Sequence, residues 1–317
     1  MDFLRKEAQT PLLEQYLMAG VPGLIATNSE SILAAARGCF SPIEGPAWES
    51  KLRLRFWADP DGSSQPPWPK PYYRGLDHLI FAGFDSQNSA LIDLRSCRAI
   101  GRLSPAMARD QARWRNVIFP NLLTLMGPAV GVTDLHCACV VRDGKGMLLA
   151  GRSGCGKSTL TMALVRRGFS FLSDDCTYFS QHAGEICAWG LIPRLKLLPR
   201  AAGFFPELAD FKAAASENDE EGFEIDPNHH LRAPRSLSCK PQTVVFLERS
   251  SSREFTIARM PAAAATAHLE EDFLAHTAEA LQLQSGIVRN LVQRGCWQLR
   301  YGEAPDVVAQ KLACLFP

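Results

Sequence analysis

A glycine-rich stretch in the middle of the chain has the residue types of a phosphate-binding loop. Within LLAGRSGCGKSTLTMAL (148–164), Gly151, Gly156, Lys157 and Ser158 fit the pattern Gly-x-x-x-x-Gly-Lys-[Ser/Thr]. Glycines allow successive backbone N–H groups to point inward at phosphate oxygens, and the helix that follows adds the positive end of its dipole. In such a loop the lysine reaches the β- and γ-phosphates, and the hydroxyl is a ligand of Mg²⁺. The stretch therefore predicts a site for ATP and Mg²⁺.

The sequence on both sides of this loop supports the same interpretation. The apolar run GMLLAG (146–151) predicts a buried strand before the loop, and apolar residues at near-helical spacing follow it. An incidental lysine in a glycine-rich turn is the alternative, but it explains neither the strand nor the helix. Cys155 stands where only backbone contact is needed, so we interpret its thiol as tolerated rather than as a redox switch. The residues expected to contact the nucleotide are Gly151, Arg152, Ser153, Gly154, Cys155, Gly156, Lys157, Ser158 and Thr159.

A pair of aspartates forms a second group of residues that could do chemistry. Asp174 follows Lys157 by 17 residues, a distance that suits a helix and a strand returning to the same sheet edge. The carboxyl ends of such strands face the ligand crevice. Neighbouring residues on a strand point to opposite faces, so Asp174 and Asp175 are expected to differ in role. One could bind Mg²⁺ while the other accepts a proton from an attacking hydroxyl.

His136 lies on a predicted strand before the loop strand, where it could orient or tune one of the aspartates. The alternative is a buried histidine with a purely structural hydrogen bond.

Residues 1–125 predict a smaller α/β unit. KLRLRFWAD (51–59) alternates apolar and charged residues, as a half-buried strand does. Further short strands are predicted in HLIFAGF (78–84), ALIDL (90–94) and RAIGRL (98–103).

Two helices are predicted in the same unit. Thr27 and Glu30 fit a capping box at the start of the first. Ser104, followed by a proline, favours the start of the second, which covers 104–125 and bends at Pro120.

Residues 126–317 predict a second unit in which strands surround the loop. A strand in 169–180 is interrupted by the acidic pair, and the chain is expected to close with a helix in 304–316. The other predicted strands are 133–141, 145–151, 185–190, 194–199, 240–250 and 296–302, with a helix in 270–295. Loops are expected in the Pro-rich stretch 59–75 and around the six acidic residues between 217 and 226.

Composition excludes several classes of protein. With 34 basic and 33 acidic residues the net charge is +1, so bulk charge does not predict a nucleic-acid binder. The longest apolar stretch, 117–132, is interrupted by two prolines and two glycines and does not predict a membrane span. The ten cysteines are scattered without a Cys-x-x-Cys pair, and the first residues lack an apolar signal core. We therefore expect a cytoplasmic protein with reduced cysteines.

The stretch from His136 to Asp175 resembles the catalytic domain of HPr kinase/phosphorylase and its relatives. That family has a histidine on a strand, a short turn, a strand, a Walker A loop, a helix, and a strand that ends in Asp-Asp. Its core also resembles that of phosphoenolpyruvate carboxykinase. The resemblance implies an HPr kinase/phosphoenolpyruvate carboxykinase-like P-loop domain in 126–317, preceded by a smaller α/β domain in 1–125.

The resemblance also implies a role for each matching residue. Asp174 would be the general base that takes the proton of the acceptor hydroxyl, with His136 beside it. Asp175 and Ser158 would hold Mg²⁺, and Lys157 would neutralise the transferring phosphate. The stretch GLIPRLKLLPR (190–200) does not match the loop that serves phosphorolysis in the bifunctional enzymes, so phosphorylase activity is not expected.

Together these features predict an ATP- and Mg²⁺-dependent kinase that phosphorylates a Ser or Thr hydroxyl of a protein or peptide. Residues 1–125 do not resemble the N-terminal domain of HPr kinase and are expected to contribute to acceptor recognition. Two alternatives stay open: a nucleotide-binding switch or assembly protein without transfer activity, and a kinase of small molecules. The sequence leaves open whether the chain forms a homo-oligomer.

Overall fold

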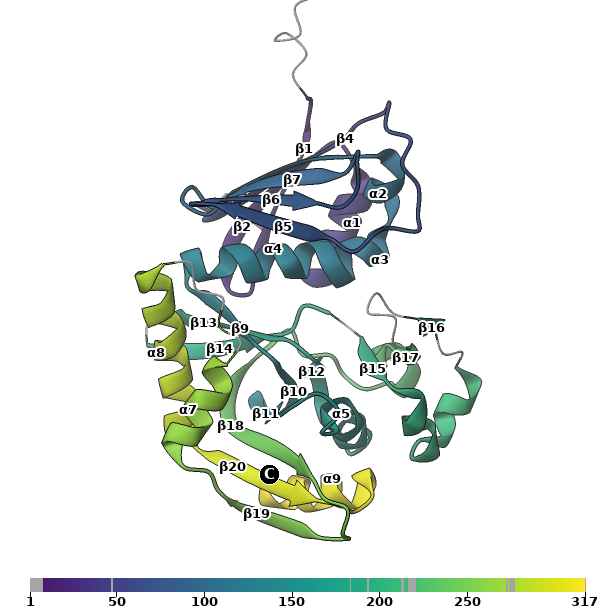
Figure 1. Cartoon of the computed structure of the whole chain (residues 1–317), viewed down its shortest axis with the longest axis vertical. Coiled ribbons are helices and arrows are strands. Elements are labelled where there is room, and N and C mark those ends of the chain that lie inside the picture. Colours follow the sequence, from purple (N-terminus) through teal and green to yellow (C-terminus); the bar gives the residue numbers. More distant parts are fainter. Residues whose placement is uncertain are drawn as a thin grey trace, which may run out of the picture. The chain divides into compact units, whose positions relative to one another are not determined.

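The computed structural model describes residues 8–46, 48–182, 184–192, 194–211, 214–215, 221–271, 273 and 277–316. The chain divides into two compact units, one of Met1–Val132 with Ala275–Ala280 and one of Thr133–Leu274 with Leu281–Pro317 (Figure 1). Both units combine helices with sheets, so the predicted mixed α/β class is confirmed. No helix among these residues is long and apolar enough to cross a membrane.

The first unit is built on an eight-stranded sheet in the order β3-β1-β2-β4-β8-β7-β6-β5. The central strands β2, β4 and β8 are parallel, and the outer pairs are antiparallel. The strands are β1 (Leu12–Met18), β2 (Val21–Thr27), β3 (Ser41–Pro42), β4 (Leu52–Ala58), β5 (Tyr72–Leu76), β6 (Leu79–Gly83), β7 (Ser89–Asp93) and β8 (Arg98–Leu103). In β4 the apolar residues are buried and the arginines exposed, as the alternation in 51–59 predicts. The stretch 59–75 is not a loop throughout, because its end enters β5.

Helices bury one face of this sheet. Trp114 packs edge-on against Phe56 of β4, with ring centroids 4.8 Å apart. The elements are α1 (Glu30–Cys39), α2 (Pro105–Arg109), α3 (Gln111–Arg113), the π-helical turn η2 (Trp114–Ile118), α4 (Phe119–Met126) and the 3₁₀ turn η3 (Gly127–Val130).

Two details of these helices differ from prediction. The capping box is wrong, because Ser29 is the N-cap of α1 and Thr27 is the last residue of β2, where its hydroxyl accepts from the Ser29 N–H at 3.2 Å. The helix expected over 104–125 is divided by a break at Asp110 and by η2, rather than only bent. Pro120 has no N–H to donate, and the wider π turn immediately before α4 accommodates that missing bond.

Helix caps offer a matched test of stability. Ser104 is buried at the start of α2, and its hydroxyl accepts from the Met107 N–H at 3.2 Å and donates to the Ser64 carbonyl at 3.1 Å. Ser104→Ala is expected to lower the free energy of unfolding by about 1–2 kcal/mol because the N–H loses its acceptor. Ser29 makes no side-chain capping bond, so Ser29→Ala is the control and should change little. Urea denaturation followed by circular dichroism measures both; equal losses would contradict the capping role of Ser104.

The second unit is built on a nine-stranded sheet. Seven of its strands follow one another in the order β12-β10-β11-β18-β14-β13-β9, and β20 pairs with both β18 and β19. The strands are β9 (Val132–Leu135), β10 (Cys137–Arg142), β11 (Lys145–Ala150), β12 (Ser170–Ser173), β13 (Thr177–His182), β14 (Glu185–Trp189), β18 (Ser238–Arg249), β19 (Phe255–Arg259) and β20 (Cys296–Tyr301). The long strand β18 pairs with β14 over its first two residues, is parallel to β11 from Lys240 to Phe246, and is parallel to β20 from Val244 to Arg249.

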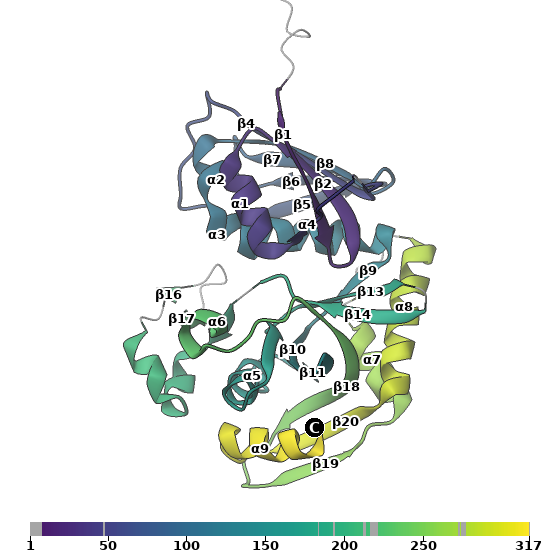
Figure 2. The same ribbon diagram turned by 180° about the vertical axis from the view of Figure 1, so that it is seen from behind.

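Two pairs of helices cover the two faces of this sheet (Figures 1 and 2). One core holds α5 (Lys157–Arg166) and α9 (Pro305–Leu315), and the other holds α7 (Ala262–Glu270) and α8 (Ala278–Arg294). The helix predicted over 270–295 begins at Ala278, and residues 272 and 274–276 of that stretch lie outside the described part.

A small sheet of β15 (Leu195–Leu197), β17 (Glu221–Ile225) and β16 (Ala214–Ala215) stands beside the first core. The short helical elements near it are η4 (Pro199–Gly203), η5 (Pro206–Asp210) and α6 (Pro227–Leu231). Of the acidic stretch expected to be a loop, residues 217–220 lie outside the described part. The remainder forms β17 and the N-cap of α6, where the Asp226 carboxylate accepts from the Asn228 N–H at 3.0 Å.

Candidate active site

The glycine-rich loop joins the end of β11 to the start of α5. Gly151, Gly154 and Gly156 have φ angles of 136°, 80° and 104°, which side chains with a Cβ rarely adopt. A Cβ on Gly156 would clash with the Tyr301 hydroxyl, and one on Gly151 would lie 2.9 Å from the Leu247 carbonyl oxygen. Glycine is therefore required at these positions both by backbone conformation and by close packing.

Internal hydrogen bonds hold this loop. Lys157 is buried, and its Nζ donates to the Gly151 carbonyl at 2.8 Å. The Tyr301 hydroxyl of β20 donates to the Cys155 carbonyl at 2.8 Å. Burial raises the pKa of the Cys155 thiol, which keeps it protonated and agrees with its interpretation as a tolerated residue.

Asp174 and Asp175 lie in the break between β12 and β13. Strands β11 and β12 are both antiparallel to β10, which separates them, so the loop and the acidic pair follow strands that end at the same edge of the sheet. The position of the acidic pair beside the loop thus follows from strand order.

Asp174 is the buried member of the pair, with 8% of its surface exposed. Its Oδ2 accepts from the backbone N–H of Lys196 in β15 at 2.9 Å. Burial raises the pKa of Asp174 to about 7, although the Lys196 N–H and the Ser158 hydroxyl lower it in part. No hydrogen bond of good geometry reaches its Oδ1 from any described residue.

Asp175 is the exposed member, and it contacts His136. The His136 Nε2 lies 3.0 Å from the Asp175 Oδ1, and their side chains are 45% and 78% exposed. This hydrogen bond lowers the pKa of the Asp175 carboxyl. His136 is not on a strand as predicted: it stands between β9, which pairs with β13, and β10, which pairs with β11 and β12. The change of partners interrupts the strand at His136.

A cavity of about 580 Å³ brings most of the predicted residues together. It is lined by His136, Ser153, Gly154, Gly156, Lys157, Ser158, Thr159, Asp174, Asp175, Lys196, Leu198 and Arg200. Gly151, Arg152 and Cys155 instead line a neighbouring cavity of about 460 Å³.

Sequence reasoning missed two cations of this cavity, Lys196 and Arg200. A Cβ on Gly154 would lie 3.7 Å from the Arg200 Nη2, so the guanidinium reaches the loop. Both cations belong to the stretch 190–200, in which a strand was expected over 194–199 but no binding residue. Two basic residues four positions apart were the signal that could have found them.

The residues present fit a magnesium–nucleotide complex. No cluster of three or more His, Cys, Asp or Glu side chains suited to a metal occurs among the described residues. Mg²⁺ is usually held by one or two protein oxygens together with substrate phosphates. The Asp174 Oδ1 is a buried acceptor without a partner, and the Ser158 hydroxyl lines the same cavity.

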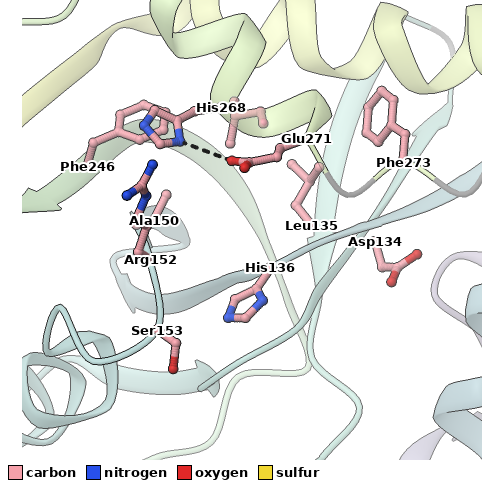
Figure 3. A pocket seen from close by; sticks show the side chains of 12 residues that line it. Asp134, Leu135, His136, Ala150, Arg152, Ser153, Phe246, His268, Glu271 and Phe273 are labelled. Atoms are coloured by element: carbon pink, nitrogen blue, oxygen red, sulfur yellow. Dashed lines mark ion pairs between the residues drawn. The ribbon is translucent and has the colours of Figure 1, made fainter.

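A smaller cavity of about 240 Å³ lies between the loop and α7. Figure 3 shows His136 and Ser153 on one side of it and Phe246 and His268 on the other. The Arg152 side chain points toward Phe246 and His268, and the His268 Nδ1 lies 3.7 Å from the Glu271 Oε2 (Figure 3).

A family model described as the HPr Serine kinase C-terminal domain matches residues 130–194. This segment is related to the HPr Serine kinase C-terminal domain. The HPr kinase-like segment contains His136, the glycine loop and the acidic pair, and it ends before Lys196. The match therefore indicates enzymatic activity of the kinase type. The resemblance predicted from these residues is confirmed at this level.

The solved structure of the Hpr(Ser) kinase/phosphatase from Coxiella burnetii is similar to this HPr kinase-related chain at 11% sequence identity and a TM-score of 0.33. That similarity covers 58% of this chain and 90% of the other. No curated protein sequence matches the chain.

Proposed function

We propose that the chain transfers the γ-phosphoryl group of ATP to a Ser or Thr hydroxyl of a protein or peptide. The observation that carries the proposal is the single cavity of about 580 Å³ that Lys157, Ser158, the acidic pair and His136 all line. Phosphoryl transfer needs positioning and charge stabilisation more than covalent chemistry, and these residue types supply both.

The donor side of the site is formed by the loop and α5. Gly154, Gly156 and the first residues of α5 line the cavity, and their N–H groups would bind the β- and γ-phosphates. Lys157 would exchange its bond to the Gly151 carbonyl for a phosphate oxygen, and Arg200 and Lys196 would add positive charge from β15 and η4. Bound Mg²⁺ would neutralise phosphate charge that these cations leave uncompensated.

We propose that Asp174 is a ligand of Mg²⁺ and that Asp175 is the general base, which is the reverse of the roles expected from the resemblance. Asp174 is buried, fixed by the Lys196 N–H, close to Ser158, and has an oxygen without a partner, which suits a ligand of Mg²⁺. Asp175 is exposed and held by His136, which suits contact with a hydroxyl that arrives from solvent. Asp175 then accepts the hydroxyl proton as that oxygen bonds to the γ-phosphorus and the bond to the β-phosphate oxygen breaks, releasing ADP.

The alternative of a nucleotide-binding switch accounts for less of this site. A switch needs the loop and a metal ligand, but it has no use for a second carboxylate oriented by a histidine. Because the stretch 190–200 does not match the phosphorolysis loop, we propose transfer in the forward direction only.

The first unit is proposed to hold the acceptor. The face of its sheet opposite the helices carries a groove of about 400 Å³. Exposed apolar residues such as Leu13 and Ile100 lie there with Arg53 and Arg98, whose charges form no ion pair with any described residue. Such a surface suits an acceptor that offers apolar and acidic side chains.

The test uses radiolabelled ATP and cell extract, with the full chain and with a chain that starts near Gly127. We expect phosphoserine or phosphothreonine only with the full chain, and nucleotide binding with both, provided that circular dichroism shows the shorter chain to be folded. Arg53→Glu with Arg98→Glu in the full chain should also reduce acceptor phosphorylation without weakening ATP binding. Full transfer without residues 1–125 would contradict acceptor recognition by the first unit, and ATP binding without any labelled protein would favour the switch.

A further inference from the structure

The cavity of about 460 Å³ on the other side of the loop is not used by the transfer chemistry. It shares Gly151–Cys155 with the loop, and its remaining wall comes from β18, β20, Met260 just before α7 and His268 in the last turn of α7. The larger cavity, by contrast, contains the acidic pair and His136. The two cavities thus meet at the loop and lead away from it toward opposite neighbours of β11, which are β10 and β18.

This arrangement determines the direction in which a bound nucleotide extends. If the terminal phosphate faces Asp175, the remaining phosphates follow the loop and the nucleoside leaves it on the side away from the acidic pair. That side is the carboxyl end of β18, which is parallel to β11 and β20. In sheets with parallel strands, ligands bind outside the carboxyl ends of those strands.

The lining of this cavity has an apolar part that suits a base. The Phe246 and His268 rings are 5.5 Å apart and tilted by 36°, and Met260 lies on the same wall. Phe246 is buried, whereas His268 and Met260 are accessible. Arg152 points toward the two rings from the loop (Figure 3), where its charge would meet the phosphate next to the nucleoside.

A polar part of the same lining suits a sugar. The Gln298 Nε2 of β20 donates to the Glu248 Oε2 at 2.8 Å, and the Glu248 Oε1 lies 3.7 Å from the Arg300 Nε. Both Glu248 and Gln298 are exposed at the cavity, so the carboxylate is oriented but still able to accept from a ligand. A carboxylate at the carboxyl end of a strand is a common acceptor for ribose hydroxyls.

We propose that this cavity is the nucleoside subsite, with the base against His268 and Met260 and the ribose hydroxyls donating to Glu248. The inference rests on the proposed function only in that the loop binds a triphosphate. The smaller cavity of about 240 Å³ shares Arg152, Phe246 and His268 with this subsite and extends from them toward His136.

The test compares three ligands: ATP, 2′,3′-dideoxy-ATP and inorganic tripolyphosphate. Binding is measured by calorimetry in the presence of Mg²⁺. The wild-type chain is expected to bind ATP about tenfold more tightly than the dideoxy nucleotide, because the dideoxy nucleotide lacks the ribose hydroxyls that would donate to the Glu248 carboxylate. Glu248→Ala should remove this difference, and Met260→Ala should weaken both nucleotides about fivefold by removing apolar contact with the base. Neither change should weaken tripolyphosphate, which has no nucleoside.

Glu271→Ala is the matched control. Glu271 is an exposed acid that contacts His268 but does not line the cavity of about 460 Å³, so its removal should leave the ratio of ATP to dideoxy-ATP affinity unchanged. Equal losses for ATP and tripolyphosphate in the Glu248 and Met260 variants, or the same loss of discrimination in Glu271→Ala, would overturn the subsite. A chain that shows the expected pattern but transfers no phosphoryl group would support the subsite and contradict the kinase proposal.

Discussion

Lys157→Ala is expected to weaken Mg·ATP binding by about a hundredfold or more while the chain stays folded. Lys157 is buried at the start of α5, and its ammonium is positioned beside the loop by the Gly151 carbonyl. Removing one partner of a buried charge pair typically costs about 2–5 kcal/mol, and the triphosphate would then lack its central compensating charge. Isothermal titration calorimetry with Mg·ATP measures the change.

Lys145→Ala is the control for this experiment. Lys145 is an exposed residue at the start of β11, at the opposite end of that strand from the loop. Its replacement by alanine removes the same single positive charge as Lys157→Ala does. We expect unchanged ATP affinity in this variant. Unchanged affinity in a folded Lys157→Ala chain would instead show that the loop is not the phosphate site.

Asp175→Asn is expected to lower the rate of phosphoryl transfer by roughly 10²- to 10⁴-fold, the usual contribution of a general base. Asparagine keeps the size of the side chain and its contact with His136, but it cannot take up the hydroxyl proton. Because Asp175 is exposed and Asp174 is the buried residue next to Ser158, Mg·ATP affinity should change little. Single-turnover kinetics separates transfer from binding.

Asp174→Asn is the companion variant and should fail at a different step. Loss of its carboxylate is expected to raise the Mg²⁺ concentration needed for half-maximal ATP binding, because Asn is a weaker ligand of a hard cation. If Asp174→Asn binds Mg·ATP normally and fails only in transfer, while Asp175→Asn loses the metal, the order of roles first expected from the resemblance is correct.

The loop and the acidic pair could be found from sequence because their structure depends on local features. Gly151 and Gly156 are required by positive φ angles, and the acidic pair interrupts the extended stretch between β12 and β13. The alternation of Leu52, Leu54 and Phe56 likewise predicts both β4 and its buried face. Local sequence determines such elements whatever the rest of the chain does.

The remaining features depend on contacts between distant parts of the chain. His136 is displaced from a strand because β9 and β10 have different partners, which no local pattern records. Lys196 reaches the site through a hydrogen bond to Asp174, 22 positions earlier in the sequence. Helix α7 was missed because AAAATAHLE is nearly uniform in alanine and has no apolar periodicity to indicate a buried face.

The burial of Asp174 has a consequence for the protein without its ligands. The ordinary pKa of the carboxyl is 3.8, and in the folded chain it is about 7. The folded state therefore binds this proton more tightly than the unfolded state does. The free energy of unfolding falls as the pH rises from about 4 to about 7, and above pH 7 the whole loss of stability persists. The cost is on the order of 4 kcal/mol. A cation beside Asp174 would offset this cost, so Mg²⁺ with nucleotide is expected to raise the free energy of unfolding more at pH 7 and above than near pH 4.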